Sequence, residues 1–257
     1  MKRIGFYLGA LAIVALASVY AAFRLMPSPD APRSTGFEAG IRDYILRHPE
    51  VVVESIGRMQ SQRQQDQAST EAQQRAAVIA NRAKIFDDPT SQVGGNPRGD
   101  VALVLFFDYQ CPYCKQGVAE EKALLAADPG VRIVYKEFPI LGAASVTASR
   151  AALAAVKQGK YLPFHDAMMA SRGAFTDLEI FSMAQSVGLD VPRLKMDMIG
   201  DDITAILRAN FALAQELGIN GTPAYVIGDR LVGGLTSAAD FKALAAEARA
   251  GAASARP

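Results

Sequence analysis

The two cysteines of this 257-residue chain, Cys111 and Cys114, are separated by only two residues. They follow an apolar run at residues 101–107 and precede a helical pattern at residues 115–127. A disulfide between them would close a loop too small to stabilise a fold, because disulfide stabilisation grows with loop length. The type and spacing of these residues therefore predict redox chemistry.

A reactive cysteine must ionise easily, because the thiolate is the nucleophile. Pro112 suits the first position of a helix, where its missing N–H costs nothing. Cys111 is then expected at the helix N-terminus, where unpaired N–H groups and the helix dipole favour negative charge. We predict Cys111 to be the exposed nucleophile. Cys114, most of a turn further on, is predicted to be the more buried resolving thiol.

Two other uses of a close cysteine pair fit this sequence less well. A zinc site takes four ligands, no further cysteine is present, and His48 and His165 lie far from the pair without ligand spacing. Both histidines are expected to be structural. Two inert core cysteines are disfavoured because a proline lies between them at a helix start. We expect no metal and no cofactor.

Composition and charge indicate a globular protein. Half of the residues are hydrophobic and the formal net charge is +1, which gives no reason to expect a nucleic-acid partner. The length suits one domain of ordinary size with appendages.

Residues 1–24 are predicted to be a signal peptide or a transmembrane anchor. Lys2 and Arg3 precede a charge-free apolar stretch at residues 4–23. About 20 apolar residues can span a bilayer, whereas residues 19–21 also form a passable signal-peptide cleavage site. The length of the stretch favours an uncleaved anchor. In both cases the positive N-terminus stays inside the cell and the rest is exported to an oxidising compartment, where disulfides persist.

A linker at residues 25–36 and a helical stalk at residues 37–88 follow. The first part of the stalk has apolar residues at helical spacing, whereas residues 60–75 are polar helix formers. A helix that is polar all round gains little by packing on a core. We predict that residues 37–59 associate with another copy, so that the protein is a homo-oligomer. The alternative is a solvated spacer that holds the catalytic domain away from the membrane.

Residues 89–257 are predicted to form the catalytic domain. Residues 94–100 are rich in turn-forming residues. The order that follows is a strand at 101–107, a helix at 115–127, a strand at 131–138, a helical block at 143–217, a hairpin at 224–232 and a closing helix at 237–250. Breaks in the helical block are expected at Gly159, Gly173, Gly188 and Gly200.

This order resembles an α/β thioredoxin fold with an inserted helical subdomain. Over residues 100–250 the chain is similar to the DsbA-like thiol–disulfide oxidoreductases of bacterial envelopes. The phrases at residues 106–115, 134–142 and 218–228 carry the resemblance. Residues 44–53 resemble the N-terminal oligomerisation region of the ScsC-like subgroup, some members of which are oligomeric disulfide isomerases.

The resemblance assigns Thr222 and Pro223 as a cis-proline loop beside the active site. An X–Pro bond has a small cis penalty, so a tight turn can hold it cis. The backbone of Thr222 would then face an extended client, which could pair with it as an added strand. With Pro112 and Tyr113, these residues are expected to contact substrate. Tyr113 stands where strongly oxidising DsbA has a histidine, which predicts a less oxidising couple.

The chain also departs from the family pattern. Many relatives have a buried carboxylate six residues before the first cysteine, where it can relay a proton to the resolving thiol. Leu105 occupies that position here. Asp108, Lys136 or Glu137 could substitute for it, and the proton route to Cys114 is left open.

The expected function is thiol–disulfide exchange in exported proteins, as an isomerase or an oxidase. The expected partners are proteins bearing thiols or disulfides and a membrane redox partner that resets the cysteine pair. Two alternatives stay open. One is an anchored chaperone or binding module for unfolded exported proteins, and the other is a dithiol protein that handles Cu(I), a soft metal that favours thiolates.

Overall fold

The computed structural model describes residues 35–173 and 175–254, and it divides the chain into two compact units, Met1–Asp66 and Gln67–Pro257. The signal or anchor segment predicted at residues 1–24 lies outside the described residues. Within the described part of the chain, no helix is long and apolar enough to cross a membrane.

Two helices make up the described part of the first unit. Helix α2 (Thr35–Arg47) starts inside the segment predicted as linker, and α3 (Pro49–Ala80) continues into the second unit. Pro49 begins α3, in agreement with the preference of proline for a first helical position. The polar residues 60–75 are helical as predicted, because they are good helix formers.

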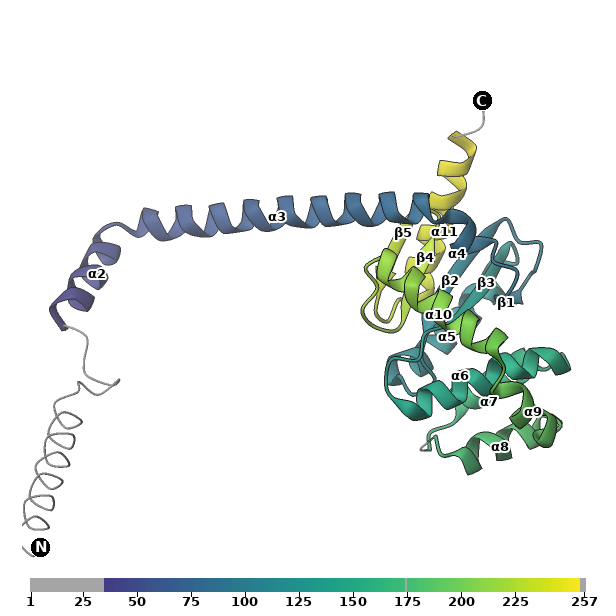
Figure 1. The fold of residues 1–257 in the computed structure, drawn as a ribbon. Coiled ribbons are helices and arrows are strands. Elements are labelled where there is room, and N and C mark those ends of the chain that lie inside the picture. The colour runs from purple at the N-terminus through teal and green to yellow at the C-terminus, as the bar shows by residue number, and fades with distance from the viewer. Residues whose placement is uncertain (1–34, 174, 255–257) are drawn as a thin grey trace, which may run out of the picture. The chain divides into compact units, whose positions relative to one another are not determined.

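A five-stranded sheet with the order β1-β3-β2-β4-β5 forms the centre of the second unit (Figure 1). Strands β2 and β3 are parallel and the other pairs are antiparallel. This is the thioredoxin-like arrangement that the sequence predicts. The strands are β1 (Gln92–Gly95), β2 (Val101–Phe107), β3 (Val131–Glu137), β4 (Ala224–Ile227) and β5 (Arg230–Gly233).

Strand β1 corrects the sequence prediction, which treated residues 94–100 as turns throughout. Gln92 pairs with Tyr135 and Gly95 with Arg132 at the edge of the sheet. Glycine has a low strand propensity, so the local sequence gives little signal. A Cβ atom on Gly94 would lie 2.9 Å from the Tyr135 hydroxyl, so the tyrosine packs over a bare backbone.

The central strand β2 is buried on both faces, which explains its continuous apolar sequence. Leu103, Leu105 and Phe107 belong to the core that contains α5 (Pro112–Ala127) and α11 (Ala238–Ser254). Val104 and Phe106 alternate with them and face the core of α4 (Arg82–Phe86) and α10 (Asp201–Glu216).

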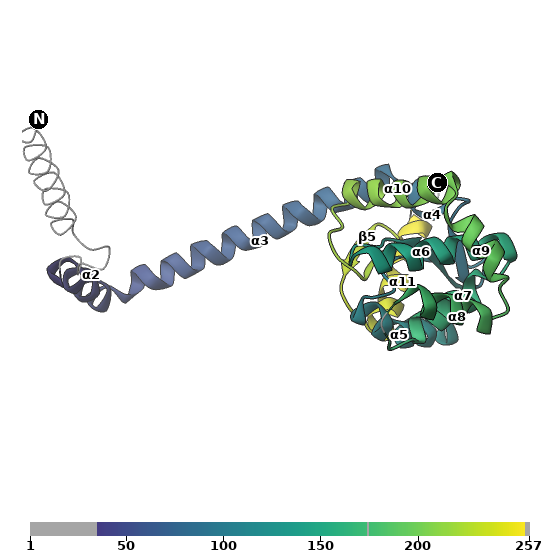
Figure 2. The ribbon, with the colours of Figure 1, turned by 60° about the horizontal axis from the view of Figure 1, so that its bottom comes forward.

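The helical block divides close to the glycines named above. Figures 1 and 2 show α6 to α9 grouped as a subdomain beside the sheet, with α10 leading back to it. Gly159 and Gly188 have positive φ values of 67° and 76°, which a glycine adopts without strain. The remaining elements are α6 (Ala143–Ala155), a 3₁₀ turn (Val156–Gln158), α7 (Tyr161–Ala170), α8 (Asp177–Ser186) and α9 (Val191–Met198).

Candidate active site

The turn between β2 and α5 presents the cysteine pair. Asp108, directly after β2, accepts hydrogen bonds from the backbone N–H groups of Gln110 (2.7 Å), Ile140 (2.9 Å) and Leu141 (2.9 Å). These bonds fix the turn to the loop after β3. Asp108 is therefore an anchor for the backbone that leads into Cys111.

The helix start has the geometry that the sequence predicts. Cys111 is the N-cap of α5, with extended backbone angles, and Pro112 is the first helical residue. The first N–H groups of the helix therefore point toward the Cys111 side chain. Cys114 lies one turn further on and is 1% exposed.

The second segment of the site is the loop between α10 and β4. The Thr222–Pro223 peptide bond is cis, the geometry that the resemblance implies. The Cys111 thiol donates a hydrogen bond to the Thr222 carbonyl oxygen, at 3.2 Å. The structure thus brings four predicted residues, Cys111, Cys114, Thr222 and Pro223, into one site.

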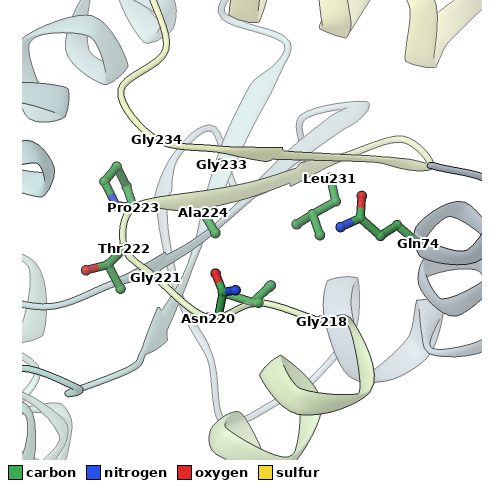
Figure 3. Close-up of a pocket in the computed structure, with 11 residues that line it drawn as sticks. Gln74, Gly218, Asn220, Gly221, Thr222, Pro223, Ala224, Leu231, Gly233 and Gly234 are labelled. Carbon is green, nitrogen blue, oxygen red and sulfur yellow. The ribbon is translucent and has the colours of Figure 1, made fainter. Parts of the chain in front are cut away.

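The cis-proline loop also borders a pocket of about 360 Å³. Figure 3 shows Thr222 and Pro223 at one end of this pocket, with Leu231 of β5 and Gln74 of α3 at the other. Four glycines contribute to the lining, so much of the wall is bare backbone. Those glycines are Gly218, Gly221, Gly233 and Gly234.

The exposure of Cys111 differs from the prediction. Cys111 is 4% exposed, so it is buried and not exposed as expected, although it is less covered than Cys114. The Thr222 loop packs against its sulfur and covers it. Pro112 and Tyr113 are exposed, Tyr113 to 57%, and form the outer rim of the site.

The environment separates the acidities of the two thiols. Hydrogen bonding from the Cys114 thiol is the main cause that lowers the pKa of Cys111 to about 5. The Thr222 side chain and the N–H groups of Cys114 and Tyr113 lower this pKa further, whereas burial raises it. The same hydrogen bond with Cys111, together with burial, raises the pKa of Cys114 far above its usual range. Cys111 is thus the thiol of the pair that ionises more easily, and Cys114 is the one that holds its proton.

None of the three proposed substitutes for a carboxylate at position 105 is free to reach Cys114. Asp108 is held by the three backbone N–H groups described above. Lys136 is turned to the other face of the sheet, where it contacts Asp88 at 2.6 Å. Glu137 accepts hydrogen bonds from three hydroxyl groups, those of Tyr109, Ser149 and Tyr161.

Sequence analysis missed two buried residues near the pair. The Tyr225 hydroxyl donates to Glu121 Oε1 at 3.1 Å, and both side chains are buried. The sequence offered one signal, because Glu121 follows Cys114 by two helical turns and therefore lies on the same face of α5. Across the described residues, no group of three or more histidine, cysteine or acidic side chains is arranged to hold a metal ion.

The fold and the site define a thioredoxin-fold protein with a cysteine pair at the first strand–helix junction. Residues 102–246 match the family model of the DSBA-like thioredoxin domain, and residues 35–66 match that of the copper resistance protein ScsC N-terminal domain. The first match spans more than half of the chain. The chain therefore belongs to the DSBA-like thioredoxin domain family.

Solved structures support this assignment. A thioredoxin-like oxidoreductase from Silicibacter pomeroyi is 47% identical, with a TM-score of 0.65 and coverage of 66% of this chain and 98% of that one. BcfH of Salmonella enterica Typhimurium is 26% identical, with a TM-score of 0.66 and coverage of 91% and 99%. ScsC of Proteus mirabilis, in a transitional conformation, is 28% identical, with a TM-score of 0.63 and coverage of 84% and 96%.

Curated relatives include a much longer protein. The Na⁺/H⁺ antiporter NhaA 1 of Salinispora arenicola is 26% identical over 147 residues, or 56% of this chain. The chain spans about a fifth, 22%, of the length of that relative. The similarity is therefore to one part of the antiporter sequence.

Proposed function

We propose that the protein is a thiol–disulfide oxidoreductase that acts on exported proteins through Cys111 and Cys114. The observation that carries this proposal is the Cys111 thiol at the start of α5, with its pKa lowered to about 5 and the Thr222 carbonyl 3.2 Å away. A thiol with this pKa is ionised at neutral pH, and the resulting thiolate can attack a client disulfide.

Two directions of exchange use the same residues. As an isomerase, the Cys111 thiolate attacks a wrong client disulfide, one client sulfur leaves as a thiolate, and another client thiolate later displaces Cys111. As an oxidase, a client thiolate attacks Cys111 of the Cys111–Cys114 disulfide, and Cys114 leaves. A second client thiolate then releases Cys111, so the client gains the disulfide and the protein keeps both electrons.

The client is proposed to lie over the rim and the cis-proline loop. Tyr113 and Pro112 are exposed beside the sulfur, and the pocket in Figure 3 continues from Thr222 toward Leu231. Strand β5 is the last strand on this side of the sheet, so an extended segment could pair with its edge. Because backbone pairing reads little sequence, this surface suits many unfolded clients.

Refolding assays separate the two directions. The wild type and Cys111→Ser are incubated with a scrambled multi-disulfide protein and, separately, with the same protein fully reduced. Recovery from the scrambled form by the wild type alone supports an isomerase, and activity only on the reduced form supports an oxidase. If Cys111→Ser restores the client as well as the wild type does, the proposed thiol chemistry is wrong and the result supports the chaperone alternative.

We further propose that α2 and the start of α3 join copies of the chain. This segment carries exposed apolar side chains at helical spacing, and its residues 35–66 match the ScsC N-terminal family model. An apolar stripe on a solvated helix gains stability when a partner covers it. The exposed large apolar side chains of residues 37–59 are Phe37, Ile41, Tyr44, Ile45, Leu46, Val51, Val52, Val53, Ile56 and Met59.

Sedimentation of the full chain tests the oligomer. Substituting Ile41→Lys together with Ile56→Lys places charge in the stripe and should shift the protein to monomer. The control is Ser61→Lys, which adds charge to an exposed position of α3 on the face opposite the stripe. A wild type that sediments as a monomer contradicts the proposal and favours the spacer.

With several sites held in one oligomer, a client could be retained while its thiols rearrange, which would favour isomerisation.

We also propose the domain boundaries and the location of the protein. Residues 37–88 form the stalk, residues 89–257 form the catalytic domain, and residues 4–23 anchor the protein to the inner membrane. The catalytic domain then lies in the periplasm or cell envelope. A membrane redox partner would reset the cysteine pair after each cycle.

Cu(I) binding is a second candidate function. It is favoured because residues 35–66 match the N-terminal domain of the copper resistance protein ScsC. The two thiols offer the soft ligands that Cu(I) prefers. Titration of the reduced protein with Cu(I) should show one site, which is lost in Cys111→Ser. Equal binding by the variant contradicts this candidate.

A further inference from the structure

Helix α5 carries a buried acidic side chain behind Cys114. Glu121 lies about two helical turns beyond Cys114, on the same face of the helix, and is 4% exposed. Its Oε1 atom accepts the hydrogen bond from the Tyr225 hydroxyl at 3.1 Å. The thiol-exchange steps described above do not use either residue.

Tyr225 stands beside the position where the carboxylate of relatives is missing. It pairs with Leu105 across β2 and β4, and paired residues in antiparallel strands point to the same face. Both side chains belong to the core on the α5 side of the sheet. The Leu105 side chain is apolar, and the neighbouring strand contributes the Tyr225 hydroxyl to the same face.

Gly117 makes room for the hydroxyl group against the helix. A Cβ atom at Gly117 would lie 2.7 Å from the Tyr225 hydroxyl and 3.3 Å from Glu121 Oε1. Gly117 is one turn beyond Cys114, so the missing side chain opens a polar space directly behind the resolving thiol.

The charges of the site support a connection between the three groups. Burial raises the pKa of Glu121 to about 7, close to the pH at which a proton acceptor works best. Burial, the Glu121 charge and then the charges of Cys114 and Cys111 raise the pKa of the Tyr225 hydroxyl. The charges of the two cysteines therefore act on the Tyr225 hydroxyl.

Other titratable groups face Glu121 from three elements. Lys122 of α5 and Asp166 of α7 act on it with opposite signs, and they form an ion pair with each other at 3.2 Å, so their effects largely cancel. Tyr135 of β3 is kept uncharged because burial and the Glu121 charge raise its pKa. Tyr225 is therefore the neighbour that controls Glu121 by a direct hydrogen bond.

We propose that Tyr225 and Glu121 form the proton relay of Cys114, a role that rests on the proposed thiol–disulfide exchange. When Cys114 attacks a mixed disulfide at Cys111, the Cys111–Cys114 bond forms and the client sulfur leaves as a thiolate. The Cys114 proton passes to the Tyr225 oxygen as Tyr225 passes its own proton to the Glu121 carboxylate. In the reverse step, the same route returns a proton to Cys114 as it leaves. Glu121 acts through Tyr225 and is a positioning residue.

A stopped-flow reaction of the reduced full chain with dithiobis(nitrobenzoate), an aromatic disulfide whose released thiolate is coloured, tests the relay. The first release follows attack by Cys111, and its rate rises with reagent concentration. The second release follows attack by Cys114 on the mixed disulfide, and its rate is independent of reagent concentration. Both phases are measured between about pH 5 and 9, a range that spans the ordinary titration of histidine and cysteine.

Glu121→Gln should slow the second phase at neutral pH by about 10- to 100-fold, within the usual contribution of a positioned proton acceptor, and should remove an inflection near pH 7. The first phase should stay within about twofold, since Cys111 does not depend on the relay for its ionisation. Tyr225→Phe removes a single oxygen and should give the same split. If Glu121→Gln folds poorly, Tyr225→Phe alone tests the effect on the second phase.

The matched control is Glu120→Gln, which removes the same charge from the same helix at a residue that caps α11 through Ala238 N. The relay is overturned if Glu121→Gln and Tyr225→Phe both fold and their second phases have the same rate and pH profile as that of Glu120→Gln. A wild type without a fast first phase contradicts the proposed function instead, so the two failures are distinct.

Discussion

The Cys111 sulfur lies 3.2 Å from the carbonyl oxygen of Thr222, although 111 positions separate the two residues in the chain. In the reduced protein the thiol donates to this carbonyl. On ionisation it loses that bond and accepts from Cys114 and from N–H groups at the start of α5. The neutral and ionised forms of Cys111 therefore have different hydrogen-bond partners. Removing these partners one at a time tests what each contributes to the pKa of Cys111.

Alkylation should reveal an unusually acidic Cys111. The rate with iodoacetamide should rise through about pH 5 and level off above it, because the pKa of Cys111 is lowered to about 5. An ordinary cysteine shows the same rise near pH 8.5. In Cys114→Ala the midpoint should move upward, since the Cys114 thiol is the main group that stabilises the thiolate. A wild-type midpoint at pH 8 to 9 would contradict this account.

Thr222→Val should raise the pKa of Cys111. The substitution keeps the shape of the side chain and the backbone carbonyl but removes the hydroxyl, which stabilises the thiolate. A neutral hydrogen-bond contribution of about 1 kcal/mol corresponds to slightly less than one pKa unit. The same alkylation profile measures the shift. Thr236→Val is the control at a buried threonine, and an equal midpoint in both variants would exclude a role for the Thr222 hydroxyl.

Tyr113→His should make the couple more oxidising. Tyr113 is 57% exposed at the rim, and a histidine there could stabilise the Cys111 thiolate. A more stable thiolate stabilises the reduced protein, so each pKa unit lost by Cys111 raises the reduction potential by about 30 mV. Equilibration with glutathione measures the potential. The expected order is wild type below Tyr113→His, and a wild-type potential at or above about −120 mV, the value for DsbA, would contradict the sequence prediction.

The sequence predicts those parts of the fold whose signal is local. Strand β2 could be predicted because burial on both faces demands an unbroken apolar run, and the start of α5 could be predicted because Pro112 and the cysteine spacing mark it. The breaks at Gly159 and Gly188 follow from their positive φ values.

Features that depend on distant contacts could not be predicted in this way. Strand β1 ends in two glycines and exists because β3 pairs with it. Cys111 is buried because the Thr222 loop, far along the chain, packs on it. Glu121 and Tyr225 are 104 positions apart, and no local pattern connects a helical glutamate with a strand tyrosine.

Tyr161→Phe should destabilise the fold by about 1–3 kcal/mol, because a buried carboxylate would lose one of its three hydroxyl donors. Burial raises the pKa of Glu137 from 4.5 to about 8, so the folded state holds a proton that the unfolded state releases. Stability should therefore fall as pH rises from about 4.5 to about 8. Loss of the Tyr161 bond should raise this pKa further and extend the fall to higher pH.

Urea unfolding at several pH values measures both effects. The control is Tyr113→Phe, whose ring is 57% exposed on α5 and whose substitution should change stability by less than about 0.5 kcal/mol. A loss in Tyr161→Phe that is no larger at pH 9 than at pH 5 would show that the hydroxyl does not stabilise the ionised carboxylate.

Gly117→Ala sets helix propensity against packing. Alanine favours a helix over glycine by about 1 kcal/mol, but its Cβ atom would lie 2.7 Å from the Tyr225 hydroxyl. The tyrosine cannot easily retreat, because its ring packs on Phe241 with centroids 4.7 Å apart. Overpacking of this kind costs about 1–3 kcal/mol, so we expect net destabilisation.

Gly57→Ala is the matched control, since nothing lies within 4 Å of a Cβ atom there and only the propensity gain should remain. A double-mutant cycle with Tyr225→Phe separates the two effects, because removing the hydroxyl relieves the clash. The alanine should then become neutral or stabilising in the Tyr225→Phe background. Equal effects of Gly117→Ala with and without the hydroxyl would mean that this oxygen does not occupy the space left open at Gly117.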